Sequence, residues 1–356
     1  MIACRPETFG CGRIQSHEID RPIGVGNQCV AELRFDMWRW TRRILIALLA
    51  LLIGGALAGA AYERLATRRD LEATPAPGRL IDVGGHKLHI WCTGSGAPPV
   101  ILESGLGGSS AGWGFVQPEV ARFTRVCSYD RAGLGYSDPG PSPRTARRIA
   151  HELVELLDRS GIEAPVVFVG ASSGGFSVRL LTSERPERVA GLVLADASHE
   201  DQSHDIPGIA PFVPFLSSVG LFRLFGVTFG QRPDSLPPAV REYARATMFR
   251  AAGYQAAADE ITHIRESAAQ VRSSRRKLTV PVVVLTAGRG ADAKWLELQR
   301  DQVGLSHRGC QIIAEQSGHV MPIQQPQVVV DAIRATVEAA RGRNDVPLCG
   351  SADQRR

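Results

Sequence analysis

The chain has 356 residues, of which 44% are hydrophobic and 22% are charged. This length and composition suit a globular enzyme of one large domain, with room for an inserted segment. The net charge of +5 is modest and the arginines are scattered along the chain, so no nucleic-acid partner is expected.

The N-terminal segment changes character at Met37. Residues 1–36 show neither helical nor strand periodicity, and we expect a disordered or non-native extension that is absent from the mature protein. Beyond a short basic stretch, residues 44–61 are uncharged and almost wholly apolar. This run approaches the roughly 17–25 residues that cross a bilayer. We therefore predict a signal anchor or transmembrane helix over residues 37–62 and a linker over residues 63–78.

A cleaved signal peptide is the alternative to an anchor. Ala56-Leu57-Ala58 and Ala58-Gly59-Ala60 both resemble cleavage sites. Arginines flank the apolar run on both sides, so charge does not determine its orientation. The place of the run near the start of the chain favours a single-pass membrane protein whose large domain lies outside the cytoplasm. Cleavage would instead give a secreted protein.

The chain has seven cysteines, and four of them follow the apolar run, at Cys92, Cys127, Cys310 and Cys349. None of the four has metal-ligand spacing, so a zinc site is not expected. No other metal and no cofactor is expected either. Cys92 and Cys127 lie in apolar strands, where free buried cysteine is the expected state. A bridge between these two is the alternative if the domain is exported.

The remaining chain alternates predicted strands and helices. Alternating residues around Gly84-Gly85 predict a hairpin over residues 80–91. Further strands are predicted at residues 100–103, 124–129, 166–169, 189–195, 280–287 and 311–314, and helices at residues 145–160 and 328–340. This order implies a mostly parallel sheet with helices on both faces, which binds ligands at the carboxyl ends of its strands.

Residues 197–277 interrupt the alternation. We interpret them as a mainly helical cap inserted into a domain over residues 79–342, which is followed by a loose tail over residues 343–356. The cap is rich in phenylalanine and leucine, which suits a site for a lipophilic group, although ordinary packing would account for some of these side chains. The candidates for contact with substrate are Phe212, Phe215, Leu216 and Phe222.

One motif follows the strand at residues 166–169. Residues 170–174 read Gly-Ala-Ser-Ser-Gly and fit the pattern G-x-S-x-G, in which a strand reverses into a helix around a serine. Both glycines are needed because side chains would collide in so sharp a turn. Ser172 would then expose its hydroxyl above the sheet edge, at the positive end of the following helix. A turn that merely ends a strand is the simpler interpretation, but the order of strand, motif and helix favours a nucleophile.

Four stretches together resemble the α/β-hydrolase fold. They are Ser-Gly-Leu-Gly-Gly at residues 104–108, Asp-Arg-Ala-Gly-Leu-Gly-Tyr-Ser at 130–137, the serine motif at 170–175 and Ser-Gly-His at 317–319. More narrowly, the chain resembles bacterial serine hydrolases that carry an N-terminal membrane segment. The resemblance implies a mostly parallel eight-stranded sheet flanked by helices, an inserted cap, and a nucleophile at Ser172.

A serine hydroxyl needs a neighbouring base, and the resemblance assigns this role to His319. The small residues before His319 let the loop after the last strand reach toward Ser172. His199 and His204, early in the cap, are the alternatives and could instead contact substrate.

The carboxylate that orients the histidine has two candidates. Asp292 follows the strand at residues 280–287, where most members of this fold carry the acid, but the turn is longer than usual. Asp196 ends the preceding strand, which holds it more rigidly, and we favour it slightly. Either aspartate could instead be structural, Asp292 as the N-cap of the next helix.

The resemblance also places an oxyanion hole at the backbone N–H groups of Leu106 and Ser173. Ala171 replaces the histidine that usually precedes the serine, which should change the shape of the pocket more than the chemistry. Asp130 and Arg131 are expected to be structural and paired beneath the site.

A serine nucleophile excludes the dehalogenases and epoxide hydrolases of this fold, which need a carboxylate at the elbow. It leaves acyl bonds, and the apolar cap with its membrane segment favours a lipophilic carboxylic ester as a small-molecule substrate. We therefore expect an ester hydrolase that forms an acyl-enzyme on Ser172. An acyltransferase of the same mechanism and a non-catalytic, membrane-tethered binding module are the alternatives.

Overall fold

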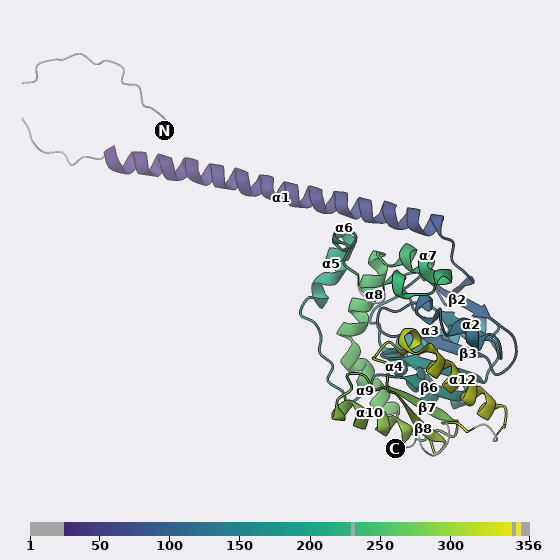
Figure 1. The fold of residues 1–356 in the computed structure, drawn as a ribbon. Coiled ribbons are helices and arrows are strands. Elements are labelled where there is room, and N and C mark those ends of the chain that lie inside the picture. Colours follow the sequence, from purple (N-terminus) through teal and green to yellow (C-terminus); the bar gives the residue numbers. More distant parts are fainter. Residues whose placement is uncertain (1–24, 229–231, 344–346, 350–356) are drawn as a thin grey trace, which may run out of the picture. The chain divides into compact units, whose positions relative to one another are not determined.

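A computed structural model describes residues 25–228, 232–343 and 347–349. Residues 1–24 of the expected extension, and residues 344–346 and 350–356 of the expected tail, lie outside the described part. The chain divides into two compact units between Gly55 and Ala56, and the second unit holds the sheet and the helices that cover it (Figure 1).

The first helix, α1 (Val25–Ala73), differs from the predicted boundaries at both ends. Residues 25–36 of the expected extension are helical, and the helix also continues through most of the expected linker over residues 63–78. No proline interrupts that segment before Pro75, and Arg68 and Glu72 form an i,i+4 ion pair with Nε and Oε1 2.7 Å apart. The expected linker is therefore helical over residues 63–73.

Part of α1 has the length and composition of a membrane span. The stretch Met37–Ala73 contains an 18-residue window with a mean hydropathy of 2.5, and none of that window is buried. A signal sequence has the same properties, so this helix fits either an anchor or a signal.

The described residues form an eight-stranded sheet in the order β1-β2-β4-β3-β5-β6-β7-β8. The strands are β1 (Arg79–Asp82), β2 (Lys87–Thr93), β3 (Val100–Glu103), β4 (Val126–Tyr129), β5 (Val166–Ala171), β6 (Val189–Ala195), β7 (Val282–Ala287) and β8 (Gly309–Ala314). β2 runs antiparallel to β1 and β4, and the other neighbours are parallel. The predicted hairpin and the mostly parallel eight-stranded sheet are confirmed.

Helices cover both faces of this sheet (Figure 1). Beyond α1, the α-helices of the described residues, including those of the inserted segment, are α2 (Gln117–Val120), α3 (Ala146–Arg159), α4 (Gly174–Glu184), α5 (Val213–Ser218), α6 (Leu221–Phe225), α7 (Pro238–Thr247), α8 (Ala251–Thr262), α9 (Ile264–Ser274), α10 (Ala293–Val303), α11 (Met321–Gln324) and α12 (Pro326–Ala340).

The central strand β5 shows why the core has two layers. Val166 and Phe168 point into the core that includes residues of α3, α4 and α9, whereas Val167 and Val169 point into the core that includes residues of α2 and α12. All four side chains are buried, as a continuous β-branched and aromatic run in a parallel strand predicts. Burial of each stabilises the fold by roughly 1.5–3 kcal/mol.

The predicted cap over residues 197–277 contains the helices α5 to α9. Its last helix has a different role from the others, because Ile264, Ala268 and Val271 of α9 belong to the core on the α3 and α4 side of the sheet. The end of the inserted segment is therefore part of the layer that covers the sheet.

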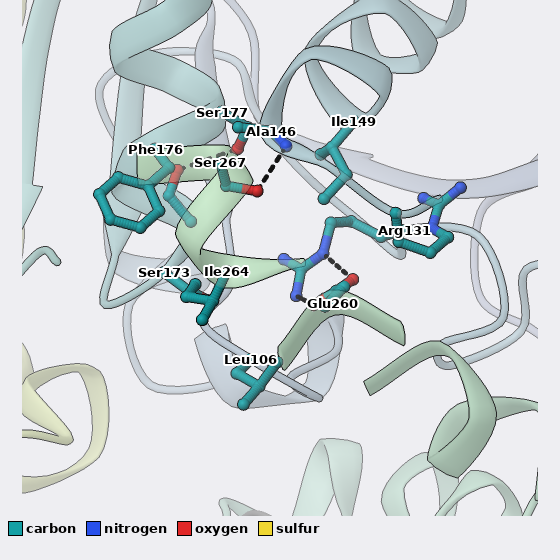
Figure 2. Close-up of a pocket in the computed structure, with 12 residues that line it drawn as sticks. Leu106, Arg131, Ala146, Ile149, Ser173, Phe176, Ser177, Glu260, Ile264 and Ser267 are labelled. Atoms are coloured by element: carbon teal, nitrogen blue, oxygen red, sulfur yellow. Dashed lines mark hydrogen bonds and ion pairs between the residues drawn. The ribbon is translucent and has the colours of Figure 1, made fainter. Parts of the chain in front are cut away.

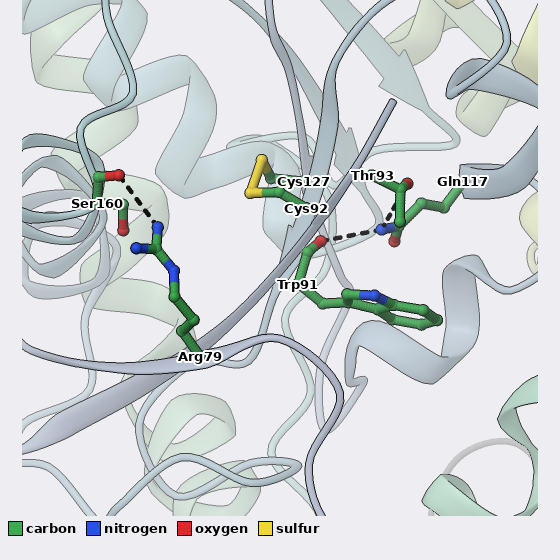
Figure 3. Close-up of a disulfide and its surroundings, with 7 residues drawn as sticks. All are labelled: Arg79, Trp91, Cys92, Thr93, Gln117, Cys127 and Ser160. Carbon is green, nitrogen blue, oxygen red and sulfur yellow. Dashed lines mark hydrogen bonds between the residues drawn. A yellow bond between two sulfur atoms is a disulfide. The ribbon is translucent and has the colours of Figure 1, made fainter. Parts of the chain in front are cut away.

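The four cysteines beyond α1 form two disulfides. Cys92 and Cys127 are direct partners in the pairing of β2 with β4 and are bridged (Figure 3). Cys310 of β8 is bridged to Cys349, which is buried. The expectation of free cysteines was wrong, since the sheet register brings Cys92 and Cys127 together. The second bridge was not foreseen, and it fixes the tail at Cys349.

Candidate active site

The serine motif forms a sharp turn between β5 and α4. Ser172 adopts a positive φ of 50°. A Cβ added to Gly170 would lie 2.5 Å from Cγ2 of Val178, and one added to Gly174 would lie 2.5 Å from the carbonyl oxygen of Ser104. The turn therefore requires glycine at both sites, because each backbone packs directly against a neighbouring element.

Three side chains from the carboxyl ends of different strands meet at this turn. The Oγ of Ser172 lies 2.8 Å from Nε2 of His319, in the loop after β8. Nδ1 of His319 lies 2.6 Å from Oδ2 of Asp196, directly after β6. A carboxylate only accepts hydrogen bonds, so Nδ1–H donates to Asp196 and Nε2 is left to accept from the serine hydroxyl. The imidazole remains accessible, since 54% of its side chain is exposed.

Asp196 is held in place by a second set of contacts. It is almost fully buried and has a positive φ of 46°. Its other carboxylate oxygen, Oδ1, accepts hydrogen bonds from the backbone N–H of Ala287, at 2.9 Å, and from the indole N–H of Trp295, also at 2.9 Å. These donors fix the plane of the carboxylate, so Oδ2 faces His319. Trp295 was not singled out by the sequence, because nothing in a sequence shows which way an indole points.

The structure separates the two candidate aspartates. Oδ1 of Asp292 accepts a hydrogen bond of 2.7 Å from the backbone N–H of Trp295, and Asp292 is the N-cap of α10. Asp292 therefore has the N-cap role that was the structural alternative for it, whereas Asp196 contacts His319.

The two alternative histidines have other partners. Nε2 of His199 lies 2.9 Å from Oδ2 of Asp301, and its Nδ1 accepts from the backbone of Asp201. His204 packs edge-on against Phe176, with ring centroids 5.7 Å apart, and burial lowers its pKa. The side chain that contacts the hydroxyl of Ser172 is that of His319.

The predicted oxyanion donors lie on both sides of the serine. Leu106 follows Gly105, whose Cβ, if it had one, would lie 2.9 Å from Cβ of Ser172. Ser173 is the N-cap of α4. Among the described residues, no backbone carbonyl accepts from the N–H of Leu106 or Ser173. Both groups are thus available to an oxygen atom placed beside Ser172.

A buried arginine holds the loop that carries Leu106. The guanidinium of Arg131 donates to the carbonyl oxygens of Ser104 and, at 2.8 Å, Gly105. It also pairs with Glu103 of β3 and with Glu260 of the cap helix α8, the latter at 2.8 and 2.9 Å. Arg131 therefore joins the sheet, the loop and the cap. Its ionic partners are Glu103 and Glu260, and Asp130 has a different partner, His89.

Asp130 forms a separate buried network. It accepts hydrogen bonds from the backbone N–H and hydroxyl of Ser110, from Tyr243 of the cap, and from Nδ1 of His89 at 2.8 Å. Burial alone would raise the pKa of this carboxyl, but His89 and the hydrogen bonds hold it below its ordinary value. The carboxylate therefore stays charged and ties the cap to the loop after β3.

A pocket lies beside the turn (Figure 2). Leu106, Phe176 and Ile264 give it an apolar wall, and the Arg131–Glu260 pair also lines it. Among the described residues, no group of three or more histidine, cysteine, aspartate or glutamate side chains is placed to hold a metal ion.

The four cap side chains predicted to contact substrate lie elsewhere. Phe212 and Phe215 have exposed fractions of 63% and 61%. Phe222 is buried against Tyr254, with ring centroids 4.8 Å apart, and Leu216 packs on the same cluster. None of the four is among the described residues that line the pocket beside Ser173. Their contact with substrate stays a prediction.

Residues 100–332 match the model of the alpha/beta hydrolase family, which is more than half of the chain. The chain therefore belongs to the alpha/beta hydrolase family. Among solved structures, Cfl2 from Burkholderia cenocepacia is similar with a TM-score of 0.60 and 25% identity, over 73% of this chain and 95% of that one. A thermophilic esterase from Thermogutta terrifontis is similar with a TM-score of 0.58 and 23% identity, over 74% of this chain and 99% of that one.

The curated relatives differ in how much of them the chain spans. An AB hydrolase superfamily protein of Gibberella zeae is 24% identical over 281 residues, which are 68% of this chain and 87% of that protein. A protein of Hormonema carpetanum named "Probable transporter efuK" is 36% identical over 129 residues, which are 34% of this chain and only 18% of that protein. The second likeness concerns one segment of a much longer protein.

Proposed function

We propose that the chain is a serine hydrolase that cleaves a lipophilic carboxylic ester through an acyl-enzyme on Ser172. The observation that carries this proposal is the continuous chain of hydrogen bonds from Ser172 through His319 to Asp196, at 2.8 and 2.6 Å. These distances, and the order of the three groups, support the arrangement that nucleophilic catalysis needs.

In the proposed mechanism, the Oγ of Ser172 attacks the ester carbonyl while Nε2 of His319 takes the hydroxyl proton. Asp196 stabilises the imidazolium that forms and keeps Nε2 directed at the serine. The backbone N–H groups of Leu106 and Ser173 stabilise the negative charge on the carbonyl oxygen. The protonated His319 then gives its proton to the leaving alcohol. A water molecule, activated by the same histidine, hydrolyses the acyl-enzyme.

The lipophilic class of substrate is supported by the apolar wall of the pocket, formed by Leu106, Phe176 and Ile264. We further propose that α1 anchors the protein in a membrane, with the catalytic domain outside the cytoplasm. Two disulfides in this domain support an oxidising compartment. If the signal-peptide alternative holds, the mature chain will be found in the soluble fraction and will begin after Ala58 or Ala60.

The test uses the full chain in detergent with p-nitrophenyl esters of increasing acyl length, together with a fluorophosphonate probe. We expect the wild type to turn over the esters and to be labelled, and Ser172→Ala to lose both by several orders of magnitude. Ser173→Ala is the matched control, because it removes the neighbouring hydroxyl but keeps the backbone N–H. It should stay labelled and active.

The same experiment separates the alternatives. A wild type that is labelled at Ser172 but hydrolyses no ester would point to an acyltransferase or an amidase. A wild type that the probe does not label would favour the non-catalytic binding module, since an unactivated serine does not react.

A further inference from the structure

One segment of the cap exposes large apolar side chains. Between residues 209 and 227, six side chains are 41–72% exposed, namely those of Ile209, Phe212, Phe215, Leu224, Phe225 and Val227. Beyond α1, only Leu80, Leu106 and Phe115 are also exposed large apolar side chains among the described residues. Such a concentration in one segment is typical of an interaction surface.

The inner side chains of this segment are packed against the rest of the cap. Val213 and Phe222 face inward and form a buried cluster with Tyr254 and Ala258 of α8. The exposed side chains therefore lie on the opposite side of α5 and α6, which are fixed on the cap by their inner faces. In the described residues of this fold, nothing covers the outer side chains.

The turn between α5 and α6 lies in backbone contact with α1. A Cβ added to Gly59 would lie 2.3 Å from the carbonyl oxygen of Val219, so only glycine allows this approach. Gly220 adopts a positive φ of 72°, and its own added Cβ would lie 3.1 Å from the carbonyl oxygen of Gly59. The contact falls two residues before Ala61, where the apolar run of α1 ends by sequence.

A partly buried ion-pair network stabilises this contact. Arg223 of α6 donates from Nε to Glu63 at 2.7 Å, from Nη1 to Asp70 at 2.6 Å and from Nη2 to Thr67 at 3.0 Å. The three acceptors recur at i, i+4 and i+7, so they share one face of α1. Glu63 is only 3% exposed. The exposed side chains of residues 209–227 are therefore held beside the end of the apolar run of α1.

The same stretch of α1 also carries exposed basic side chains. Arg64, Arg68 and Arg69 are exposed, and so are Tyr62 and Leu65. Arginine and tyrosine next to an apolar run are typical of the headgroup region of a bilayer, where the positive charges meet lipid phosphates.

We infer that the bilayer holding α1 also covers the exposed apolar side chains of residues 209–227, so the cap is docked on the membrane surface. This inference rests on the proposal that α1 is a membrane anchor. In this inference Phe212 and Phe215 contact lipid instead of substrate. Both are exposed, and neither lines the pocket beside Ser173. The chemistry is that of an interfacial segment, whose aromatic and aliphatic side chains enter the boundary between headgroups and acyl chains.

The test measures quenching by lipid at single cysteines in the full chain. Cys4, Cys11 and Cys29 are first replaced by serine, and the two disulfides leave no other cysteine of the chain free to react. Phe215→Cys is then labelled with bimane and reconstituted in vesicles of phosphatidylcholine and phosphatidylglycerol. We expect brominated acyl chains to lower its fluorescence at least twofold relative to unbrominated lipid.

Two control positions make the result decisive. Lys294→Cys, on the exposed side of α10, should show no quenching. Leu51→Cys, in the middle of the apolar run, reports on the anchor alone and should be quenched most strongly. Each site is exposed, so the substitutions leave the packing of the core unchanged.

The possible outcomes distinguish the docking of the cap from the proposed membrane anchor and from the proposed ester hydrolysis. Quenching at position 51 without quenching at 215 overturns the docking but keeps the anchor. Absence of quenching at 51 overturns the anchor and the docking together, while the ester assay is unaffected. Bimane self-quenching at 215 that grows with the protein-to-lipid ratio, without quenching by bromine, would assign this surface to a second copy of the chain. A fluorescence change at 215 caused only by a long-chain ester would assign it to substrate.

Discussion

At the scale of single residues, the two candidate aspartates differ in what they contact. Asp196 accepts the Nδ1–H of His319, and Asp292 accepts the first-turn amide of Trp295 as an N-cap. The sequence could not decide between them, because both follow a strand and precede a polar turn. Their substitution by asparagine distinguishes a catalytic from a structural carboxylate.

We expect Asp196→Asn to lower kcat for p-nitrophenyl esters by roughly 10⁴-fold, because an amide at this position no longer holds His319 in the tautomer that accepts the serine proton. Asp292→Asn should keep kcat within about twofold, since asparagine caps a helix as well as aspartate does. Steady-state kinetics and thermal unfolding of both variants check this. A loss of activity in Asp292→Asn that matches the loss in Asp196→Asn would contradict the assignment.

The sequence predicted the candidate-site residues that belong to a recognisable motif. It did not predict the residues that reach the site only through tertiary packing. Ser172 and His319 were found because the elbow and the loop after the last strand have recognisable patterns. Trp295 and Glu260 contact the site because α10 and α8 pack against it, and no local sequence pattern predicts these contacts. A buried arginine such as Arg131 is expected to have a carboxylate partner. Which carboxylate it is depends on how the cap packs on the core, and the sequence does not show that.

At the scale of elements, the cap and the core are joined through Glu260 of α8. This carboxylate binds Nε and Nη2 of Arg131, which in turn holds the carbonyl oxygens of Ser104 and Gly105. Both charged side chains are buried, so the pair is sensitive to removal of one partner. A change in the cap should therefore alter the loop that carries Leu106, whose backbone N–H is the proposed oxyanion donor.

We expect Glu260→Gln to lower the free energy of unfolding by about 2–3 kcal/mol, because the buried guanidinium loses half of its compensating charge. The kcat for esters should fall as well, since the loop with Leu106 is held less firmly. Thermal unfolding and steady-state kinetics measure the two effects. Glu266→Gln, on the exposed side of α9, is the matched control. A Glu260→Gln variant as active and stable as this control would exclude the coupling.

Strands were easier to predict than the helices around them. Continuous apolar runs such as Val166–Ala171 are specific for buried parallel strands, and their bounds lie close to those expected. The helical extension of α1 beyond Ala61 was missed, because its stability depends on contacts of Glu63, Thr67 and Asp70 with Arg223, which lies 150 or more positions away along the chain. Tertiary contacts override local composition in such segments.

At the scale of the whole molecule, the disulfides and a buried cluster join distant parts of the chain. The two bridges close loops of 35 and 39 residues, each expected to stabilise the fold by about 3–4 kcal/mol in the chain-entropy account. Their pairing could not be read from the sequence, because it depends on the register of β2 with β4 and on the return of the tail to β8.

The buried cluster is centred on Glu200, five residues after the end of β6 at Ala195. Arg179 of α4 donates to it at 2.9 Å, and Arg275, after α9, lies 3.0 Å away. Burial acts to raise the pKa of the Glu200 carboxyl, but the hydrogen bonds and charge of Arg179 lower it from its ordinary value of 4.5 to about 2. This carboxylate therefore joins the helix after the elbow to the end of the cap.

The lowered pKa predicts how stability depends on pH. Between pH 4.5 and about 2, the unfolded chain binds a proton at Glu200 and the folded chain does not, so the contribution of Glu200 to stability is complete above pH 4.5 and is lost as pH falls. Glu200→Gln should be less stable than the wild type by about 3 kcal/mol at pH 7, because Arg179 loses its buried partner.

The difference between wild type and Glu200→Gln should shrink as the pH is lowered from 4.5 toward 2, since protonation then removes the same charge from the wild type. Urea unfolding of the full chain in detergent, at a series of pH values, measures this difference directly. Glu297→Gln, which removes an exposed carboxylate of α10, should show little difference at any pH. If the stability difference between wild type and Glu200→Gln stayed constant from pH 6 to pH 3, the buried carboxylate would not be the charged partner of Arg179.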